Sequence, residues 1–175
     1  MYFTLRIPDI NPEIFYIMEQ KITIRKSTRE DIPFIGQHAY RLLEFGPPAW
    51  RRQEHELMIK ADIRHNTEAI LSDNPDIEVF IAEDENDIPC GFLHMCMQTD
   101  YYTGERHAHI TDIVVIKNAE GKGIGRLLME KADDWAREKK ARWITLNVFE
   151  ENKHAMAHYE KAGYHKEWTK YLKEL

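Results

Sequence analysis

Hydrophobic and polar residues alternate along the 175-residue chain with two periods, one typical of strands and one typical of helices. Alternation, or dense β-branched and aromatic content, predicts strands over 22–25, 78–83, 88–100, 107–117, 142–150 and 165–175, the second and third forming a hairpin. Apolar residues at helical spacing predict helices over 27–45, 50–71, 124–137 and 152–162. Strands that alternate with helices indicate an α/β fold with a mixed sheet.

Regular patterning covers residues 21–175, and neither a repeat nor a low-complexity linker divides that range. We therefore expect one domain there, since its length suits a single hydrophobic core. Residues 1–20 precede the pattern, and we interpret them as an N-terminal extension or an extra strand.

Composition and charge exclude several classes of function. Lys and Arg total 24 against 30 Asp and Glu, and this net charge of −6 argues against a nucleic-acid binder, which needs a clustered basic surface. No apolar run reaches the roughly 18 residues of a membrane span, and no secretory signal is recognisable. The two cysteines, Cys90 and Cys96, fit no metal or redox motif, so we interpret them as reduced thiols of a cytoplasmic protein.

Three glycines at every second position, Gly121, Gly123 and Gly125, stand where a predicted strand leads into a predicted helix. Glycine in a helix is unfavourable by about 1 kcal/mol relative to alanine, so we expect the backbone here to meet a ligand. A helix start offers free N–H groups and the positive end of the helix dipole, which together bind phosphate-like anions. The spacing matches neither a P-loop nor a dinucleotide-binding βαβ unit.

The residues around this turn follow a known fingerprint. Ile113-Val114-Val115 ends the strand, and Glu120-Gly121-Lys122-Gly123-Ile124-Gly125 begins five residues later. Asn152 and Tyr159 then precede Gly163-Tyr164 in the last predicted helix. In this order the chain resembles the GNAT superfamily of N-acetyltransferases. Glu120 departs from the Gln or Arg usual in that family, and we expect its side chain to turn to solvent or to cap the turn.

The resemblance carries expectations about fold, cofactor and assembly. It implies a mixed, mostly antiparallel sheet of about six to seven strands, splayed in the middle and flanked by about four helices. It also implies acetyl-CoA as co-substrate, no metal and a homodimer. The strand predicted over 165–175 also favours a homodimer, because it would leave an open sheet edge in a monomer. The cofactor-binding residues that it implies are Ile113, Val114, Val115, Gly121, Lys122, Gly123, Ile124, Gly125, Arg126, Asn152 and Tyr159.

Acetyl transfer to an amine needs a proton donor for the departing thiolate and a route by which the amine loses its proton. The resemblance implies Tyr159 as the donor, and its offset of seven from Asn152 places both near one helix face. For the base we predict His109, which shares a strand face with Thr111 and Ile113 if no bulge intervenes. Asp112 is the alternative, since a bulge would change its face, and deprotonation by solvent is the third.

His107 and His109 form an H-x-H pair, but no third ligand stands at a suitable spacing, so we predict no metal site. The leading prediction for function is an N-acetyltransferase that acts on the primary amine of a small molecule, without a nucleic-acid or membrane partner. A protein or peptide amine is the alternative acceptor, and an inactive CoA-binding regulatory module is the alternative class.

Overall fold

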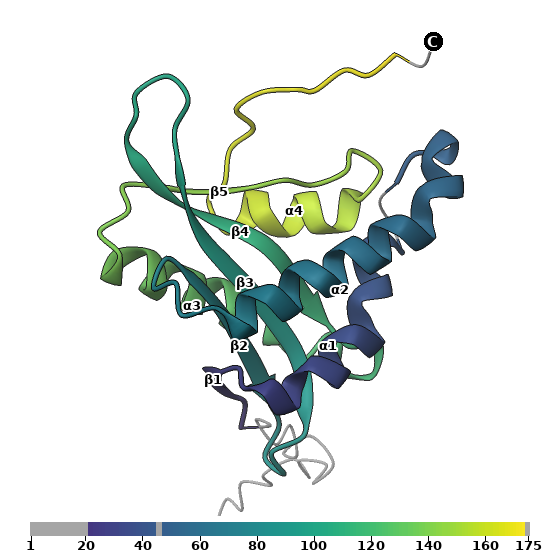
Figure 1. Cartoon of the computed structure of the whole chain (residues 1–175), viewed down its shortest axis with the longest axis vertical. Coiled ribbons are helices and arrows are strands. Elements are labelled where there is room, and N and C mark those ends of the chain that lie inside the picture. The colour runs from purple at the N-terminus through teal and green to yellow at the C-terminus, as the bar shows by residue number, and fades with distance from the viewer. Residues whose placement is uncertain (1–20, 45–46, 174–175) are drawn as a thin grey trace, which may run out of the picture.

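The structure, a computed structural model, describes residues 21–44 and 47–173, so the predicted N-terminal extension lies outside the described residues. Its centre is one sheet of five strands in the order β1-β2-β3-β4-β5 (Figure 1). These strands are β1 (Thr23–Lys26), β2 (Ile77–Glu83), β3 (Pro89–Thr99), β4 (Arg106–Val115) and β5 (Ile144–Leu146). Neighbouring strands from β1 to β4 are antiparallel, and β5 pairs with β4 in parallel. The predicted mixed, mostly antiparallel sheet is confirmed.

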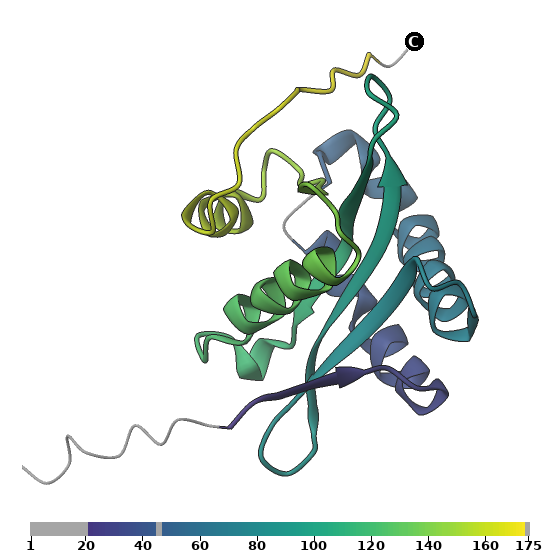
Figure 2. The ribbon, with the colours of Figure 1, turned by 90° about the vertical axis from the view of Figure 1, so that its left-hand side faces the viewer.

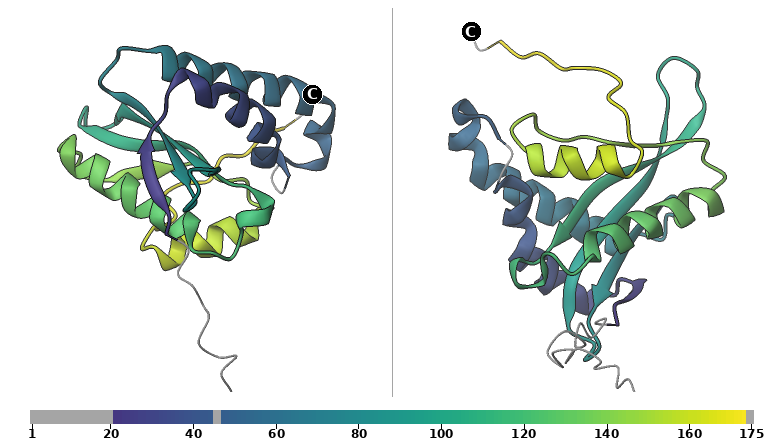
Figure 3. Two further views of the ribbon diagram at one scale, coloured as in Figure 1. Left: turned by 90° about the horizontal axis from the view of Figure 1, so that it is seen from below. Right: turned by 180° about the vertical axis from the view of Figure 1, so that it is seen from behind.

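Four α-helices cover the two faces of this sheet, as predicted. They are α1 (Ile32–His38), α2 (His55–Leu71), α3 (Ile124–Glu138) and α4 (Lys153–Lys161). Short 3-10 segments precede or extend them: η2 (Arg29–Asp31), η3 (Ala39–Leu43), η4 (Ala49–Glu54) and η5 (Lys117–Ala119). Helices α1 and α2 lie on one face, called here the α2 face, and α3 and α4 lie on the other, the α3 face (Figures 2 and 3). Within the described ranges, no helix is long and apolar enough to cross a membrane.

Two apolar clusters form the core, one on each face of the sheet. On the α3 face, Leu128, Ala132 and Trp135 of α3 are buried against residues of β2, β3 and β4. On the α2 face, Ile35 of α1 and Ala69 of α2 pack with a second set of strand residues, Val79, Ile81, Phe92 and Val114. The amphipathic pattern of 124–137 predicts the first cluster because its apolar stripe must find a sheet to cover.

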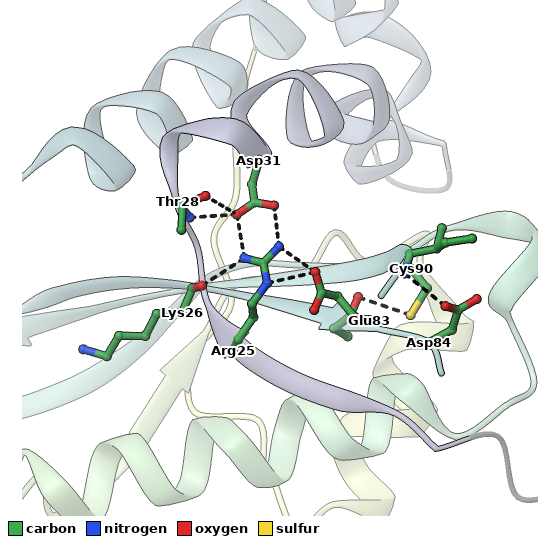
Figure 4. A network of polar contacts seen from close by, with 9 residues as sticks. Arg25, Lys26, Thr28, Asp31, Glu83, Asp84 and Cys90 are labelled. Atoms are coloured by element: carbon green, nitrogen blue, oxygen red, sulfur yellow. Dashed lines mark hydrogen bonds and ion pairs between the residues drawn. The ribbon is translucent and has the colours of Figure 1, made fainter. Parts of the chain in front are cut away.

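A polar network fastens the edge strand β1 to the rest of the fold (Figure 4). Both terminal nitrogens of Arg25 donate to the Asp31 carboxylate, at 2.7 and 2.8 Å, and Nε donates to Glu83 at 2.8 Å. The Asp31 carboxylate also accepts from the backbone N–H of Thr28, which completes the capping of η2. Burial alone would raise the pKa of Asp31, but the bonds from Arg25 and Thr28 lower it overall. The network fixes the entry of the chain into the helices of the α2 face.

The C-terminal part of the sheet is smaller than predicted. The expected strand over 142–150 is reduced to β5, and 165–173 forms no strand, so the described sheet has five strands rather than six to seven. In 165–173 the large apolar residues are Trp168, Tyr171 and Leu172, all exposed. Because Tyr171 would face away from the other two in a strand, the segment has no single apolar face to bury. The homodimer, predicted partly from a strand here, loses that support and stays a prediction.

Candidate active site

The two strands at the centre of the candidate site separate after a short contact. β4 and β5 pair only over Ala108–Ile110 and Ile144–Leu146. From Thr111 onward, no strand of the described chain pairs with the β5 side of β4, while its other side stays bonded to β3. Apart from the Val115 carbonyl, which accepts from Arg41, backbone groups along this edge are therefore free to bond an extended ligand, because they have the geometry of an unfilled strand position. The predicted splay of the sheet lies here.

The glycine-rich turn follows directly from the open part of β4. Gly121 and Gly123 both have φ of +76°, a left-handed conformation that favours glycine, and Gly123 is the N-cap of α3. A Cβ atom at either position would meet no atom within 4 Å. No side chain caps α3, and none of the backbone carbonyls in the described residues accepts from the amides of residues 121–126. The turn therefore presents bare N–H groups and a helix dipole to open space, as an anion site requires.

Glu120 is half-exposed, in line with the expectation of a side chain turned to solvent, but it also has a protein partner. Its carboxylate pairs with Nη2 of Arg41, which extends from η3 on the α2 side of the sheet. The Arg41 side chain is only 8% exposed, and its Nε donates to the carbonyl of Val115 at 2.9 Å. Sequence reasoning missed Arg41 because 79 residues separate it from Glu120 and no local pattern connects them.

A β-bulge changes the predicted faces of β4. Asp112 pairs with His94 of β3, but the next pair joins Ile110 to Met95, so Thr111 is an extra residue on β4. Ile113 packs against the cluster of the α3 face and does not share a face with His109 as predicted. Thr111 is exposed, with its Oγ1 3.5 Å from Sγ of Cys96, the residue that pairs with His109. The bulge instead brings His109 and Asp112 to the same face, the α2 face, where both are buried at 8% exposure.

His109 is held by a hydroxyl on the neighbouring strand. Its Nδ1 lies 2.7 Å from Oγ1 of Thr145, the residue that pairs with it on β5. Because the Thr145 hydroxyl can donate to the carbonyl of Ala108, we assign the Nδ1–H tautomer, which leaves the lone pair on Nε2. Burial, and then the charge of His107, lower the pKa of His109, while Asp112 acts in the opposite direction. The imidazole is therefore neutral at neutral pH, as a base must be.

Asp112 belongs to a polar cluster in which Asn66 and His94 are also buried and Asp62 is partly buried. Its Oδ2 accepts from Nδ2 of Asn66 at 2.7 Å and lies 3.6 Å from Nδ1 of His94. Asn66 is fully buried on α2, and its Oδ1 has no partner among the described residues. Burial, together with the charge of Asp112, raises the pKa of Asp62 to about 6. This acidic cluster can accept a proton or bind an ammonium group.

Sequence reasoning missed Asp62, Asn66 and His94, although a partial signal was available for two of them. Asp62 and Asn66 stand four apart in the predicted helix and share a stripe with buried Ala69, so two polar residues interrupt an apolar face. His94 gave no signal, since its pairing with Asp112 depends on the bulge at Thr111.

Helix α4 contributes from the opposite face. Asn152 is its N-cap, with Oδ1 accepting from the N–H of Ala155 at 3.1 Å, so its Nδ2 is left for a ligand. Tyr159 is half-buried two turns along, and its ring lies 6.0 Å from that of Tyr164. Burial raises the pKa of Tyr159, so the hydroxyl keeps its proton well above neutral pH. The structure does not bring Tyr159 beside His109, because helix α4, which carries Tyr159, lies on the α3 face (Figure 2), whereas His109 lies on the α2 face.

No metal centre accompanies these residues in the described part of the chain. No three His, Cys, Asp or Glu side chains lie close enough together there to hold an ion. His107, the other half of the H-x-H pair, stacks on Trp143 with ring centroids 5.6 Å apart.

Comparisons with known proteins agree with this geometry. A sequence profile of the acetyltransferase (GNAT) family matches residues 38–164. The uncharacterized N-acetyltransferase YhfO of Bacillus subtilis is 27% identical over 143 residues, which cover 82% of this chain and 89% of that protein. The peptidyl-lysine N-acetyltransferase YjaB of Salmonella typhimurium is 30% identical over 119 residues, or 66% of this chain and 71% of that one.

Solved structures share the fold at lower identity. The aminoglycoside N-acetyltransferase AAC(6')-Iy, in complex with CoA, superimposes with a TM-score of 0.68 and 16% sequence identity. That alignment covers 89% of this chain and 95% of the other, so the likeness extends over nearly the whole domain.

Proposed function

Because the chain belongs to the GNAT acetyltransferase family and is an N-acetyltransferase, we propose that it moves an acetyl group from acetyl-CoA to the primary amine of a small molecule by direct attack in a ternary complex. One observation carries the proposal: the open edge of β4 runs from a buried base cluster to an uncapped glycine turn. The cluster suits an amine, the edge suits an extended thioester arm, and the turn suits a diphosphate.

The residues present fit acetyl-CoA at one specific place. At Gly121 and Gly123 a Cβ would meet open space, so a phosphate can approach the backbone of residues 121–126 without a clash. We assign the thioester arm to the main chain of 113–115, whose side chains are ordinary core residues, and to Nδ2 of Asn152. Acetyl-CoA supplies an activated acetyl group, and the protein positions it.

The two faces of β4 divide the proton chemistry. On the α2 face, neutral His109 takes the proton of the attacking ammonium group, either directly or through water, and Asp112 is the alternative acceptor. On the α3 face, Tyr159 donates a proton to the departing thiolate. The amine would then approach the open edge of β4 from the α2 face, and the thiol would leave toward the α3 face.

The carboxylates of Asp112, which is buried, and Asp62, which is partly buried, favour a cationic acceptor. Asp62 and Asp112 have no Lys or Arg partner among the described residues, so an ammonium group can pair with them. A peptide lysine would satisfy the same groups, and the relative YjaB is named a peptidyl-lysine N-acetyltransferase, so a protein amine is the second candidate. The cytoplasmic location stays a prediction.

Release of free thiol from acetyl-CoA tests the proposed function. We expect the purified protein to release CoA thiol when small primary amines, including diamines and amino sugars, are added, because the amine is the attacking group. A lysine-containing peptide forms the parallel arm, and the double variant His109→Gln/Asp112→Asn is the matched control. Thiol release with the peptide alone would favour the second candidate, a protein amine, as the acceptor. If neither acceptor gave thiol release, the proposed acetyltransferase activity would be contradicted.

The pH dependence of the rate tests His109 as the base. A base acts when deprotonated, so the rate with saturating amine should rise with pH through the pKa of His109. Since burial lowers that pKa, we expect the midpoint below its ordinary value of about 6.5. His109→Gln should remove this limb, whereas Asp62→Asn, which removes the nearby carboxyl that titrates at about 6, should leave it. Loss of the limb in Asp112→Asn alone would assign the base to Asp112.

A further inference from the structure

Arg41 joins three segments that are distant in sequence. Its Nε donates to the carbonyl of Val115 at 2.9 Å, Nη1 donates to Glu44 at 2.8 Å, and Nη2 donates to Glu120. The guanidinium thus lies where the open edge of β4 meets the glycine turn, although it comes from η3. Its side chain is 8% exposed, so a full positive charge is held in place there rather than extended into solvent.

Glu120 creates an electrostatic problem for an anion site. Its carboxylate stands one residue before the amides of residues 121–126 and would repel a diphosphate bound to them. The pair with Arg41 removes this repulsion and leaves a cation beside the same turn. Glu120 is also half-exposed, at 53% of its side chain, so solvent or a ligand can replace it as the partner of Arg41.

The surroundings of Arg41 are open enough for a ligand. A surface hollow of about 290 Å³ lies beside this segment and is lined by His38 and Tyr40, which flank Arg41 in the chain, and by residues 116–118. Burial, and then the charge of Arg41, lower the pKa of His38, so the guanidinium is close enough to this side of the hollow to act on it electrostatically. Lys117 is exposed on the other wall and adds a second cation. The hollow is therefore bordered by the Lys117 cation and by the segment 116–118, which leads into the glycine turn.

We propose that Arg41 binds the diphosphate of acetyl-CoA and that Glu120 holds its guanidinium in position until the cofactor displaces the carboxylate. The inference rests on the proposed function, since it needs acetyl-CoA as the substrate. A guanidinium presents paired N–H donors that match two phosphate oxygens as well as two carboxylate oxygens, so the exchange keeps its hydrogen bonds. Arg41 is then a binding residue contributed from the helices of the α2 face.

Steady-state kinetics with two thioesters test this role. Acetyl-CoA carries the diphosphate and acetyl-pantetheine lacks it, while both carry the same acetyl group and arm. Arg41→Gln should raise KM for acetyl-CoA about tenfold, the effect of losing one charge-assisted contact, and should leave KM for acetyl-pantetheine within twofold. Arg106→Gln, which removes another carboxylate-paired guanidinium from the far end of β4, is the control and should change neither.

The role of Glu120 is separated by a double variant. Glu120→Gln should lower KM for acetyl-CoA, because the carboxylate no longer competes for Arg41, and should leave acetyl-pantetheine unaffected. If Arg41 binds the diphosphate itself, the KM of the double variant Arg41→Gln/Glu120→Gln for acetyl-CoA should stay well above the wild-type value. Return of the double variant to wild-type KM would show that Arg41 only neutralises Glu120, and would overturn the proposal.

Equal losses with both thioesters would also overturn the proposal, since they would assign Arg41 to the arm or to the fold through Val115. Both outcomes differ from failure of the proposed function, in which the wild type itself releases no thiol. A melting temperature measured for each variant without cofactor shows whether any loss comes from unfolding.

Discussion

Gly123→Asp is expected to abolish binding of CoA, with a loss of at least about 100-fold in affinity, or about 2.7 kcal/mol. The substitution acts in two ways. Gly123 has φ of +76°, where a residue with a Cβ is strained by about 1–2 kcal/mol. The new carboxylate would also stand at the uncapped start of α3 and take the place of the anion that the free N–H groups attract. Isothermal titration with CoA, and the rise in melting temperature at saturating CoA, measure the effect.

Two controls separate strain, charge and position. Gly123→Ala introduces the backbone strain without the charge, so it should weaken CoA binding less than Gly123→Asp does. Gly104→Asp introduces both the strain and the charge, because Gly104 has φ of +71° and open space around it. Gly104 lies in the loop between β3 and β4, away from the glycine turn. This variant should bind CoA like the wild type. If Gly123→Asp binds CoA as tightly as Gly104→Asp does, the anion does not bind at the start of α3.

The anion site was predictable because its determinants are local in sequence. Gly121 and Gly123 predict a left-handed backbone conformation, and the apolar stripe from Ile124 onward predicts the start of a helix. Together they predict that free N–H groups lie at one point. The N-cap role of Asn152 was predictable for the same reason, and the structure confirms it. Local rules of backbone conformation thus recover the half of the site that is proposed to hold the cofactor.

The acceptor half was predictable only in part, because its geometry depends on pairing between strands. His109 and Asp112 were both candidates, but counting along an ideal strand puts them on opposite faces. The bulge at Thr111 reverses this, and it is a property of the register between β3 and β4 rather than of either sequence alone. Arg41 and Asn66 reach the site from helices 40 or more residues away, and helix packing, which no local pattern encodes, brings them there.

The excess strands in the prediction have a related cause. The segment 165–173 contains strand-favouring aromatic residues, but β propensity records how well a residue fits a half-buried surface. Trp168 and Tyr171 are 78% and 91% exposed, so the described chain offers them no such surface. Strand content at a chain end therefore follows from available partners, which propensity does not report.

Tyr159→Phe is expected to lower kcat about 100-fold or more, the range typical of a general acid, while affinity for CoA changes little. Departure of the thiolate needs a proton, and burial raises the pKa of Tyr159, so its hydroxyl is protonated throughout the working range. The substitution removes this proton and keeps the ring that packs near Tyr164. Thiol release at saturating amine and acetyl-CoA measures kcat, and titration with CoA measures affinity.

Tyr164→Phe is the matched control for Tyr159→Phe. It removes the hydroxyl of the neighbouring ring, whose oxygen is buried without a partner in the described residues, so stability should be unchanged or higher and kcat unchanged. Equal falls in kcat for the two variants would point to packing of α4 rather than proton donation. A normal kcat in Tyr159→Phe would mean that the thiolate leaves unprotonated or takes its proton from water. Since the β4 edge, the base cluster and the anion turn would all be intact, catalysis would then rest on positioning alone.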